Sequence, residues 1–348
     1  MSIESVKPAT SAARTTTMRA AVAARFGGPE VVRVAEVPRP EPRPGELLVR
    51  VRASTVSIAD HRLRSRSVPR GLGLVVAPVI GVFRPRRPVL GMDAAGVVER
   101  VGEGVTRFTP GDEVIVMRGA RMGCHAEFVV VDADGEVARK PANLSFDEAA
   151  AIVFGGHTAL RYLDGVTIGP GSRVLVNGAS GAVGSAVVQL AAGRGAHVTG
   201  VTSGRNADLV RSLGASEIVD YTRDDFAAGS GSGASADDSR YDVIVECVGT
   251  APFHRVAHLL RPGGALLLVI ADLPGMLAAG GQARRSGLVV DHRGGRMGSD
   301  GMERLAALAE SGELRPVIDR TFDLDEIVDA HRYVDTGRKR GSVVLRVG

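Results

Sequence analysis

The sequence predicts an α/β protein with two domains, a β-rich domain and a doubly wound parallel sheet. The chain has 348 residues, which suits two hydrophobic cores of about 150 residues each. Alternating apolar and charged residues mark the first third. From Phe146 onward, short runs of valine, isoleucine and leucine alternate with helical periods. Such alternation is typical of βαβ units and a parallel sheet.

The first third justifies the β-rich domain. Residues 47–52 alternate apolar and charged side chains, as in a half-buried strand, and proline and glycine punctuate this part densely. Residues 1–17 lack the apolar core of a secretory signal, so we expect a flexible tail there. The uncharged stretch Gly71–Phe83 is too short to span a bilayer, which needs roughly 20 residues. It is either a buried segment or flap, or an apolar surface that meets a membrane or an apolar substrate.

The remaining elements follow in order along the chain. Strands are expected at residues 173–177, 197–201, 217–221, 241–248 and 265–270. Helices are expected at 182–192, from 206 to Gly214, and from Pro252 to the stop signal at 261–264. Residues 229–239 are rich in glycine and serine without periodicity, so we expect a surface loop. A helix at 301–310 and a strand at 342–347 complete the chain.

The first of these strands runs into a glycine-rich turn that predicts dinucleotide binding. A pyrophosphate needs a strand, a tight turn of bare backbone and the positive N-terminus of a helix. Gly181 leaves room for the phosphate, and Gly184 allows close packing of the helix on the strand. The predicted phosphate-binding residues are Ala179, Ser180, Gly181, Ala182, Val183 and Gly184.

The tip of the second strand predicts NADPH rather than NADH. NAD-binding domains usually place a carboxylate there to bind the ribose 2′-hydroxyl, but residues 197–206 contain none. Ser203 and Arg205 instead offer a hydroxyl and a guanidinium to a 2′-phosphate. Arg205 has no such role if its side chain points away from the turn.

Composition excludes several other classes. The net charge is only +4, aromatic residues make up 4%, and tryptophan is absent, so we expect no nucleic-acid partner. We also expect no membrane span. The two cysteines, Cys124 and Cys247, stand in unrelated contexts and predict neither a disulfide framework nor a structural zinc. A reducing cytoplasm fits this usage best.

Seven motifs in order along the chain resemble those of the medium-chain dehydrogenase/reductase superfamily. They are Gly91–Val98, Pro110–Val114, Ala126–Phe128, Gly155–Leu160, Gly178–Gly184, Ser212–Ala215 and Tyr241–Gly249. The resemblance covers nearly the whole chain from Met18. It implies a GroES-like β-barrel domain at 18–147 and 291–348, a Rossmann domain at 148–290, and a homodimer.

Departures from the motifs point to the zinc-independent quinone-reductase branch. Where zinc alcohol dehydrogenases carry catalytic ligands, this chain has Ser57, Met92 and Phe154. A catalytic zinc needs three protein ligands, so we expect no metal. The resemblance implies that Ser57 and Thr158 lie near the nicotinamide, Tyr221 near the adenosine, Cys247 and Val248 where the ribose passes, and Ile270 beside the carboxamide.

The chemistry expected is reduction of a quinone or an α,β-unsaturated carbonyl by hydride from NADPH, with a small apolar electrophile as substrate. No catalytic residue is certain. The substrate-pocket candidates are Ser57, His61, Arg62, Met92 and His157, although both histidines could be merely packed side chains. Two alternatives stay open: a pathway-specific enoyl or alkenal reductase, and a non-catalytic NADPH-binding regulatory protein.

Overall fold

The second half of the chain folds around a six-stranded parallel sheet, as the sequence predicts. In the computed structural model, which describes residues 16–228 and 240–348, the strand order is β10-β9-β8-β11-β12-β13. The strands are β8 (Arg173–Asn177), β9 (His197–Thr202), β10 (Glu217–Asp220), β11 (Tyr241–Glu246), β12 (Leu260–Leu268) and β13 (Val289–Asp291). The first strand of this sheet, β8, lies in the middle, and the later strands are added on both sides of it. This order confirms the prediction of a doubly wound Rossmann domain.

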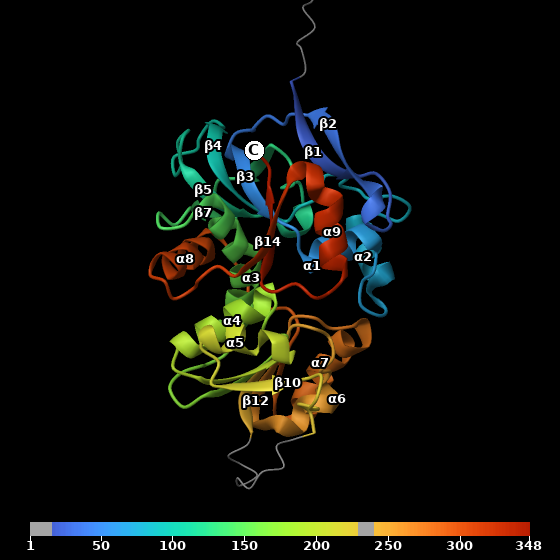
Figure 1. Ribbon diagram of the computed structural model, residues 1–348, viewed down its shortest axis with the longest axis vertical. Helices are drawn as coiled ribbons and strands as arrows, with labels where there is room; N and C mark the ends of the chain where they lie inside the picture. Colours follow the sequence, from blue (N-terminus) through green and yellow to red (C-terminus); the bar gives the residue numbers. More distant parts are fainter. Residues whose placement is uncertain (1–15, 229–239) are drawn as a thin grey trace, which may run out of the picture.

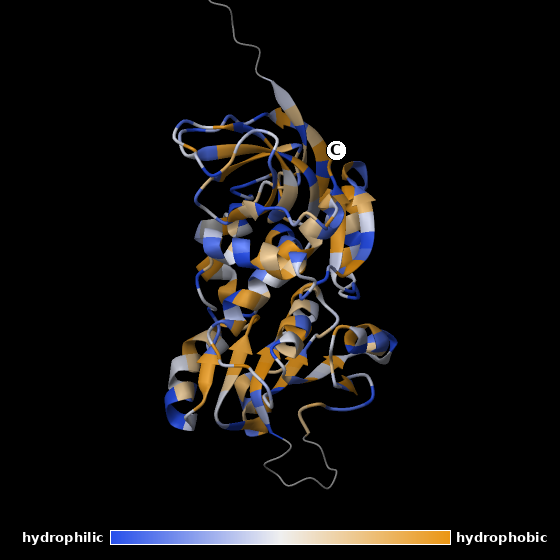
Figure 2. Ribbon diagram, turned by 90° about the vertical axis from the view of Figure 1, so that its left-hand side faces the viewer, coloured by the Kyte–Doolittle hydropathy of each residue, from blue (hydrophilic) through white to orange (hydrophobic). Residues whose placement is uncertain are grey.

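Apolar side chains point to both faces of this sheet because helices cover both. In β8, Val174 and Val176 join the core that includes α4 (Ala182–Gly193). Leu175, between them, joins the opposite core with α6 (Phe253–Val256). The result is a layer of hydrophobic strands flanked by more polar helices in the lower half of Figure 2.

The β-rich domain is built from the first third of the chain and its last residues. Its seven-stranded sheet has the order β14-β15-β3-β4-β5-β7, with β6 also paired to β3. The strands are β3 (Glu46–Thr55), β4 (Asp93–Val101), β5 (Glu113–Met117), β6 (Phe128–Asp132), β7 (Val137–Arg139), β14 (Ile318–Asp323) and β15 (Ser342–Arg346). A hairpin, β1 (Thr17–Ala23) and β2 (Val32–Pro38), pairs beside it. Because β15 pairs with β3, the C-terminus completes the N-terminal sheet (Figure 1).

The helix α3 (Phe146–Leu163) joins the two domains. A capping box on Ser145 and Glu148 starts it, and it packs against α4 on one side and against β3, β4 and β15 on the other. The remaining helices are α1 (Ile58–Ser65), α2 (Leu72–Ile80), α5 (Ala207–Ser212), α7 (Leu273–Ser286), α8 (Ser299–Glu310) and α9 (Ile327–Asp335).

Two expectations about local structure are corrected. The helix expected from Pro252 is shorter: α6 ends at Val256, a 3-10 turn covers Ala257–Leu259, and β12 begins at Leu260. Its pairing with β11 shifts register at the predicted stop signal, 261–264. The stretch Gly71–Phe83 forms the helix α2 and a turn rather than a buried segment, since Phe83 is 94% exposed. The predicted loop at 229–239 and most of the predicted tail lie outside the described residues. Within the described part, no helix is long and apolar enough to cross a membrane.

Candidate functional site

A cleft of about 1120 Å³ opens where the carboxyl ends of β8, β9, β10 and β11 meet the β domain. Doubly wound sheets bind their ligands at this edge, where the strand order reverses. Most of the predicted site residues line the cleft: Arg62, Ser180, Gly181, Ala182, Val183, Gly184, Ser203, Arg205, Tyr221, Cys247, Val248 and Ile270. The wall facing the sheet comes from α1 and from the segment after α9.

The turn after β8 has the geometry of a phosphate cradle. Gly178 adopts φ +84°, a backbone conformation that favours glycine. A Cβ on Gly184 would lie 2.1 Å from the Gly178 carbonyl oxygen, so only glycine fits where α4 meets the turn. Gly181 begins α4 without a side-chain cap, which leaves amide groups at the helix N-terminus for an anion. These residues fit the pyrophosphate of a dinucleotide.

Hydrogen bonds hold this turn against the tip of β9. The Thr202 Oγ1 and Asn206 Nδ2 atoms both donate to Ser180 Oγ, at 3.0 and 3.2 Å. Asn206 also donates to Ser203 Oγ at 3.3 Å. Asn206 is buried, and the sequence prediction missed it. The network positions the strand tip that would face the adenosine ribose.

Cations surround that end of the cleft. Arg205 lines it together with Arg223, Arg338 and Lys339, and none of the three arginine side chains has a hydrogen-bond or ion-pair partner among the described residues. Burial lowers the pKa of Lys339 to about 8. Three carboxylates also line the cleft: Asp220, Asp224 and Asp225. Asp225 pairs with Arg255 at 2.7 Å. Hydrogen bonds from Thr222 lower the pKa of Asp220, so it is charged at neutral pH.

The sequence prediction missed these basic residues of the C-terminal segment. Arg338 and Lys339 follow α9 and belong to a different domain from the nucleotide turn. The run of basic residues at 338–340, set between a helix and a strand, was the available signal. The sequence prediction also missed Asp220, because this residue ends the neighbouring strand β10 rather than β9.

A buried carboxylate shapes the tip of β11. Glu246 is fully buried and accepts hydrogen bonds from the amide groups of Val248, Gly249 and Ala251, and from Asn177 Nδ2 at 2.8 Å. It therefore fixes the turn that presents Val248 to the cleft. Burial raises the pKa of the neighbouring Cys247 thiol, so this cysteine is a packed neutral group rather than a nucleophile.

The α1 end of the cleft is largely apolar and carries one free cation. Arg62 lines the cleft with Ile58 and Phe154. Burial lowers the pKa of the Arg62 guanidinium, and no described residue pairs with its side chain. An anionic oxygen on a ligand is the partner that such a group lacks.

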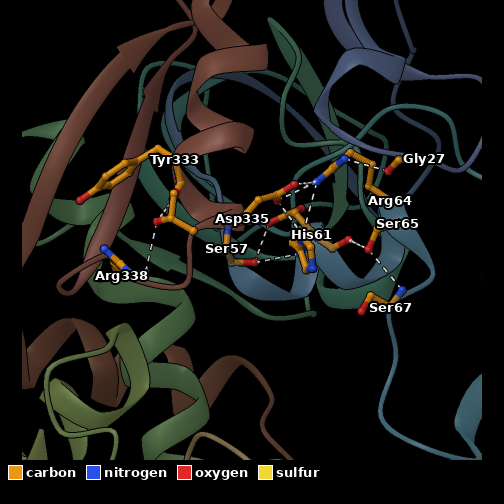
Figure 3. A network of polar contacts seen from close by, with 11 residues as sticks. Gly27, Ser57, His61, Arg64, Ser65, Ser67, Tyr333, Asp335 and Arg338 are labelled. Carbon is orange, nitrogen blue, oxygen red and sulfur yellow. Dashed lines mark hydrogen bonds and ion pairs between the residues drawn. The ribbon is translucent and has the colours of Figure 1, made fainter. Parts of the chain in front are cut away.

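Behind Arg62, a polar network joins α1 to α9 (Figure 3). The buried Arg64 donates to both carboxylate oxygens of Asp335, at 2.7 and 2.6 Å, and His61 Nδ1 lies 2.6 Å from the same carboxylate. Ser57 caps α1, and its Oγ donates to Asp60 at 2.6 Å. Neither Ser57 nor His61 is among the residues that line the cleft.

Four other predicted residues also lie outside the cleft lining. His157 is buried with its Nε2 atom 3.3 Å from Glu136, and Thr158 donates back to the Phe154 carbonyl of its own helix. Met92 packs against the core of the β domain. Ala179 is fully buried beneath the turn. Arg62 is thus the one substrate-pocket candidate that the described structure brings to the cleft.

Fold and cleft together define a two-domain dinucleotide-binding oxidoreductase. Residues 43–142 match the family model of the alcohol dehydrogenase GroES-like domain, and residues 213–345 match that of the zinc-binding dehydrogenase domain. The chain belongs to the medium-chain dehydrogenase/reductase superfamily, in its quinone-oxidoreductase-like branch, and uses a nicotinamide cofactor.

Similar proteins include reductases of several kinds. The mitochondrial NAD(P)H oxidoreductase RTN4IP1 of Mus musculus is 31% identical over 97% of this chain and 91% of its own length. The 2-methylene-furan-3-one reductase of Solanum lycopersicum is 30% identical over 92% of this chain and 76% of its own. The quinone oxidoreductase of Coxiella burnetii superposes with a TM-score of 0.80 at 27% identity, covering 96% and 100% of the two chains.

Proposed function

We propose that the protein reduces quinones or α,β-unsaturated carbonyls with NADPH and without zinc. The observation that carries the proposal is the cleft itself, which joins a phosphate cradle and a basic nucleotide end to an apolar end with one free guanidinium. Bound NADPH supplies a hydride from nicotinamide C4. The names of the quinone oxidoreductase and the furanone reductase among the relatives support the same substrate class.

The protein's own part in this reaction is to bind the acceptor and to orient it against the cofactor. Ile58 and Phe154 offer an apolar surface for a planar acceptor. Arg62 can bind the acceptor oxygen and stabilise the negative charge that hydride transfer develops there. A proton from water then completes the reduction.

The preference for NADPH follows from charge. A 2′-phosphate at the tip of β9 would meet Arg205, with Arg223 and Arg338 lining the same cleft, and residues 197–206 of β9 and its tip contain no carboxylate. Asp225 is already paired with Arg255. Asp220 and Asp224 oppose the preference, but the three arginines outnumber them. Guanidinium groups bind phosphate through paired, charge-assisted hydrogen bonds.

The absence of zinc from the proposed mechanism follows from the donor set. Ser57 is engaged with Asp60, Met92 packs in a core, and Phe154 has no donor atom. Within residues 16–228 and 240–348, no three His, Cys, Asp or Glu side chains gather as a metal site. A catalytic zinc needs three such ligands.

The test is NADPH consumption by chelator-treated protein with a panel of quinones and enones, with NADH in parallel. We expect turnover that survives the chelator and favours NADPH. Loss of turnover with the chelator, restored by zinc, would overturn the metal-free proposal. NADPH binding without turnover on any acceptor would overturn the quinone and enone assignment and favour a narrow pathway enzyme or a regulatory protein.

The cofactor preference has a separate test in Arg205→Gln, with Arg211→Gln as the matched control because Arg211 is exposed on α5 and pairs with Asp208. Arg205→Gln should weaken NADPH binding by about 1–3 kcal/mol and leave NADH binding unchanged. Equal losses for both nucleotides would contradict the role of Arg205. Nucleotide fluorescence titration measures both.

A further inference from the structure

An apolar helix and the turn that follows it stand exposed on the β domain. The helix α2 contains no charged residue, and the apolar sequence continues to Phe83. Val75 is 56% exposed, Val82 52% and Phe83 94%. Large apolar side chains that stand together in water mark an interaction surface rather than ordinary surface residues.

Arginines flank this apolar segment, which contains no acidic residue of its own. No aspartate or glutamate occurs between Asp60 and Asp93. Five exposed arginines flank α2, and none forms an ion pair with a carboxylate in the described structure: Arg66, Arg70, Arg84, Arg86 and Arg87. The segment therefore carries a net positive charge next to its exposed apolar side chains, and no ion pair neutralises these five arginines in the described structure.

Two of the arginines also shape the segment. Arg66 donates to the Val82 carbonyl at 2.7 Å, and Arg86 donates to the Pro78 carbonyl at 2.5 Å. These hydrogen bonds hold the turn after α2 so that Phe83 projects into solvent. The segment thus presents apolar side chains next to guanidinium groups. This combination suits the surface of a lipid bilayer, where acyl chains lie beneath anionic headgroups.

We propose that α2 and residues 81–87 dock on the surface of an anionic lipid bilayer. The apolar side chains would enter the boundary between headgroups and acyl chains, and the arginines would bind lipid phosphates. A second copy of this chain is a poorer occupant, because a symmetric contact would oppose the same arginines. A nucleic acid would leave the apolar side chains without a partner.

This docking surface adjoins the cleft. Leu273, at the start of α7, donates its amide to the Arg70 carbonyl at 2.9 Å and sits against Gly71. The segment between β12 and α7 carries Ile270, which lines the cleft, and α2 and α7 lie on the same side of the molecule (Figure 1). A docked bilayer would thus present apolar acceptors near the cleft. This consequence rests on the proposed function, whereas the docking does not.

The experiment is flotation of the full chain with vesicles, which needs no cofactor or turnover. One set of vesicles contains equal parts phosphatidylglycerol and phosphatidylcholine, and the other contains phosphatidylcholine alone. We expect binding to the anionic vesicles only, weakening as salt is raised because the arginine contribution is screened. Failure of turnover in the acceptor panel would leave this result unaffected.

Matched variants separate the apolar and the basic contributions. Phe83→Ser should weaken binding by about tenfold, whereas Val289→Ser, which removes an exposed apolar side chain from the sheet edge, should leave it unchanged. Arg70→Gln combined with Arg84→Gln should weaken binding at low salt. The control pair, Arg211→Gln with Arg304→Gln, removes two exposed arginines from α5 and α8, away from α2 (Figure 1), and should have no effect.

Three results would overturn the proposal. One is failure of the protein to bind anionic vesicles at low salt, and another is equal binding by Phe83→Ser and the unchanged chain. The third is self-association without vesicle binding. In that case light scattering would show a mass that rises with protein concentration, and Phe83→Ser would abolish the rise. Circular dichroism of each variant shows that it is folded before its binding is compared.

Discussion

The ion pair between Arg64 and Asp335 should contribute strongly to stability because one partner is cut off from water. The Arg64 side chain has no exposed surface, and Asp335 is 23% exposed. Asp335→Asn keeps the shape of the side chain but leaves a buried guanidinium without its counter-charge. Breaking a buried pair costs about 3–5 kcal/mol, and the partial exposure of Asp335 reduces our expectation to about 2–3 kcal/mol.

The matched control lies on the same helix. Asp329 pairs with Arg332 at 2.7 Å, but both side chains are more than 60% exposed, so Asp329→Asn should change stability too little to resolve. Urea unfolding followed by circular dichroism compares the two variants, and thermal unfolding should show a fall of about 3–5 °C for Asp335→Asn alone. Equal midpoints for the two variants would refute the argument that burial, rather than distance, decides the strength of the pair.

Three further predictions concern the cleft and the buried core. Asp220→Asn should tighten NADPH binding and leave NADH binding nearly unchanged, since it removes the carboxylate beside the proposed 2′-phosphate; weaker NADPH binding in a titration would contradict this. Gly184→Ala should destabilise the fold because its Cβ would overlap the Gly178 carbonyl oxygen. A Cβ on Gly181 would meet that oxygen at 3.4 Å, so Gly181→Ala should mainly weaken nucleotide binding. A lower unfolding midpoint for Gly181→Ala than for Gly184→Ala would count against the cradle. Burial raises the pKa of Asp93 to about 8, so this carboxyl takes up a proton on folding and its contribution to stability falls as pH rises from about 4 to 8. Urea midpoints of Asp93→Asn should fall less steeply over that range than those of the unchanged chain, and an identical slope would argue against a protonated Asp93.

The local elements of the Rossmann domain could be predicted because short-range patterns determine them. The strand at 173–177 and the helix beginning at Ala182 lie where hydrophobic periodicity and turn chemistry place them. From Pro252 the helix is shorter than predicted, because β12 begins at Leu260 and the proline and glycines at 262–264 fall in a register shift of this strand. At Gly71–Phe83 the sequence left both a buried segment or flap and an exposed apolar surface open, because apolar composition by itself does not determine whether a segment is buried.

The candidate site was predictable only in part for a similar reason. Residues of the glycine turn and the tip of β9 belong to one βαβ unit, so sequence spacing brings them together. Arg338 and Lys339 reach the same cleft from the end of the chain, and no local pattern relates them to a turn more than 150 residues earlier. His61 was predicted to lie in the substrate pocket, but its partner Asp335 comes from another helix and draws the imidazole into an ion-pair network.

The sequence by itself determined the class of this protein, because the strand–turn–helix motif and the ordered family motifs depend on neighbouring residues whose backbone conformations are local. Tertiary structure alone decided which charges face the cleft, which histidines are engaged elsewhere, and which apolar helix stays in water. Those outcomes depend on contacts between segments distant in the chain, where burial and the proximity of a partner set the energy of each side chain.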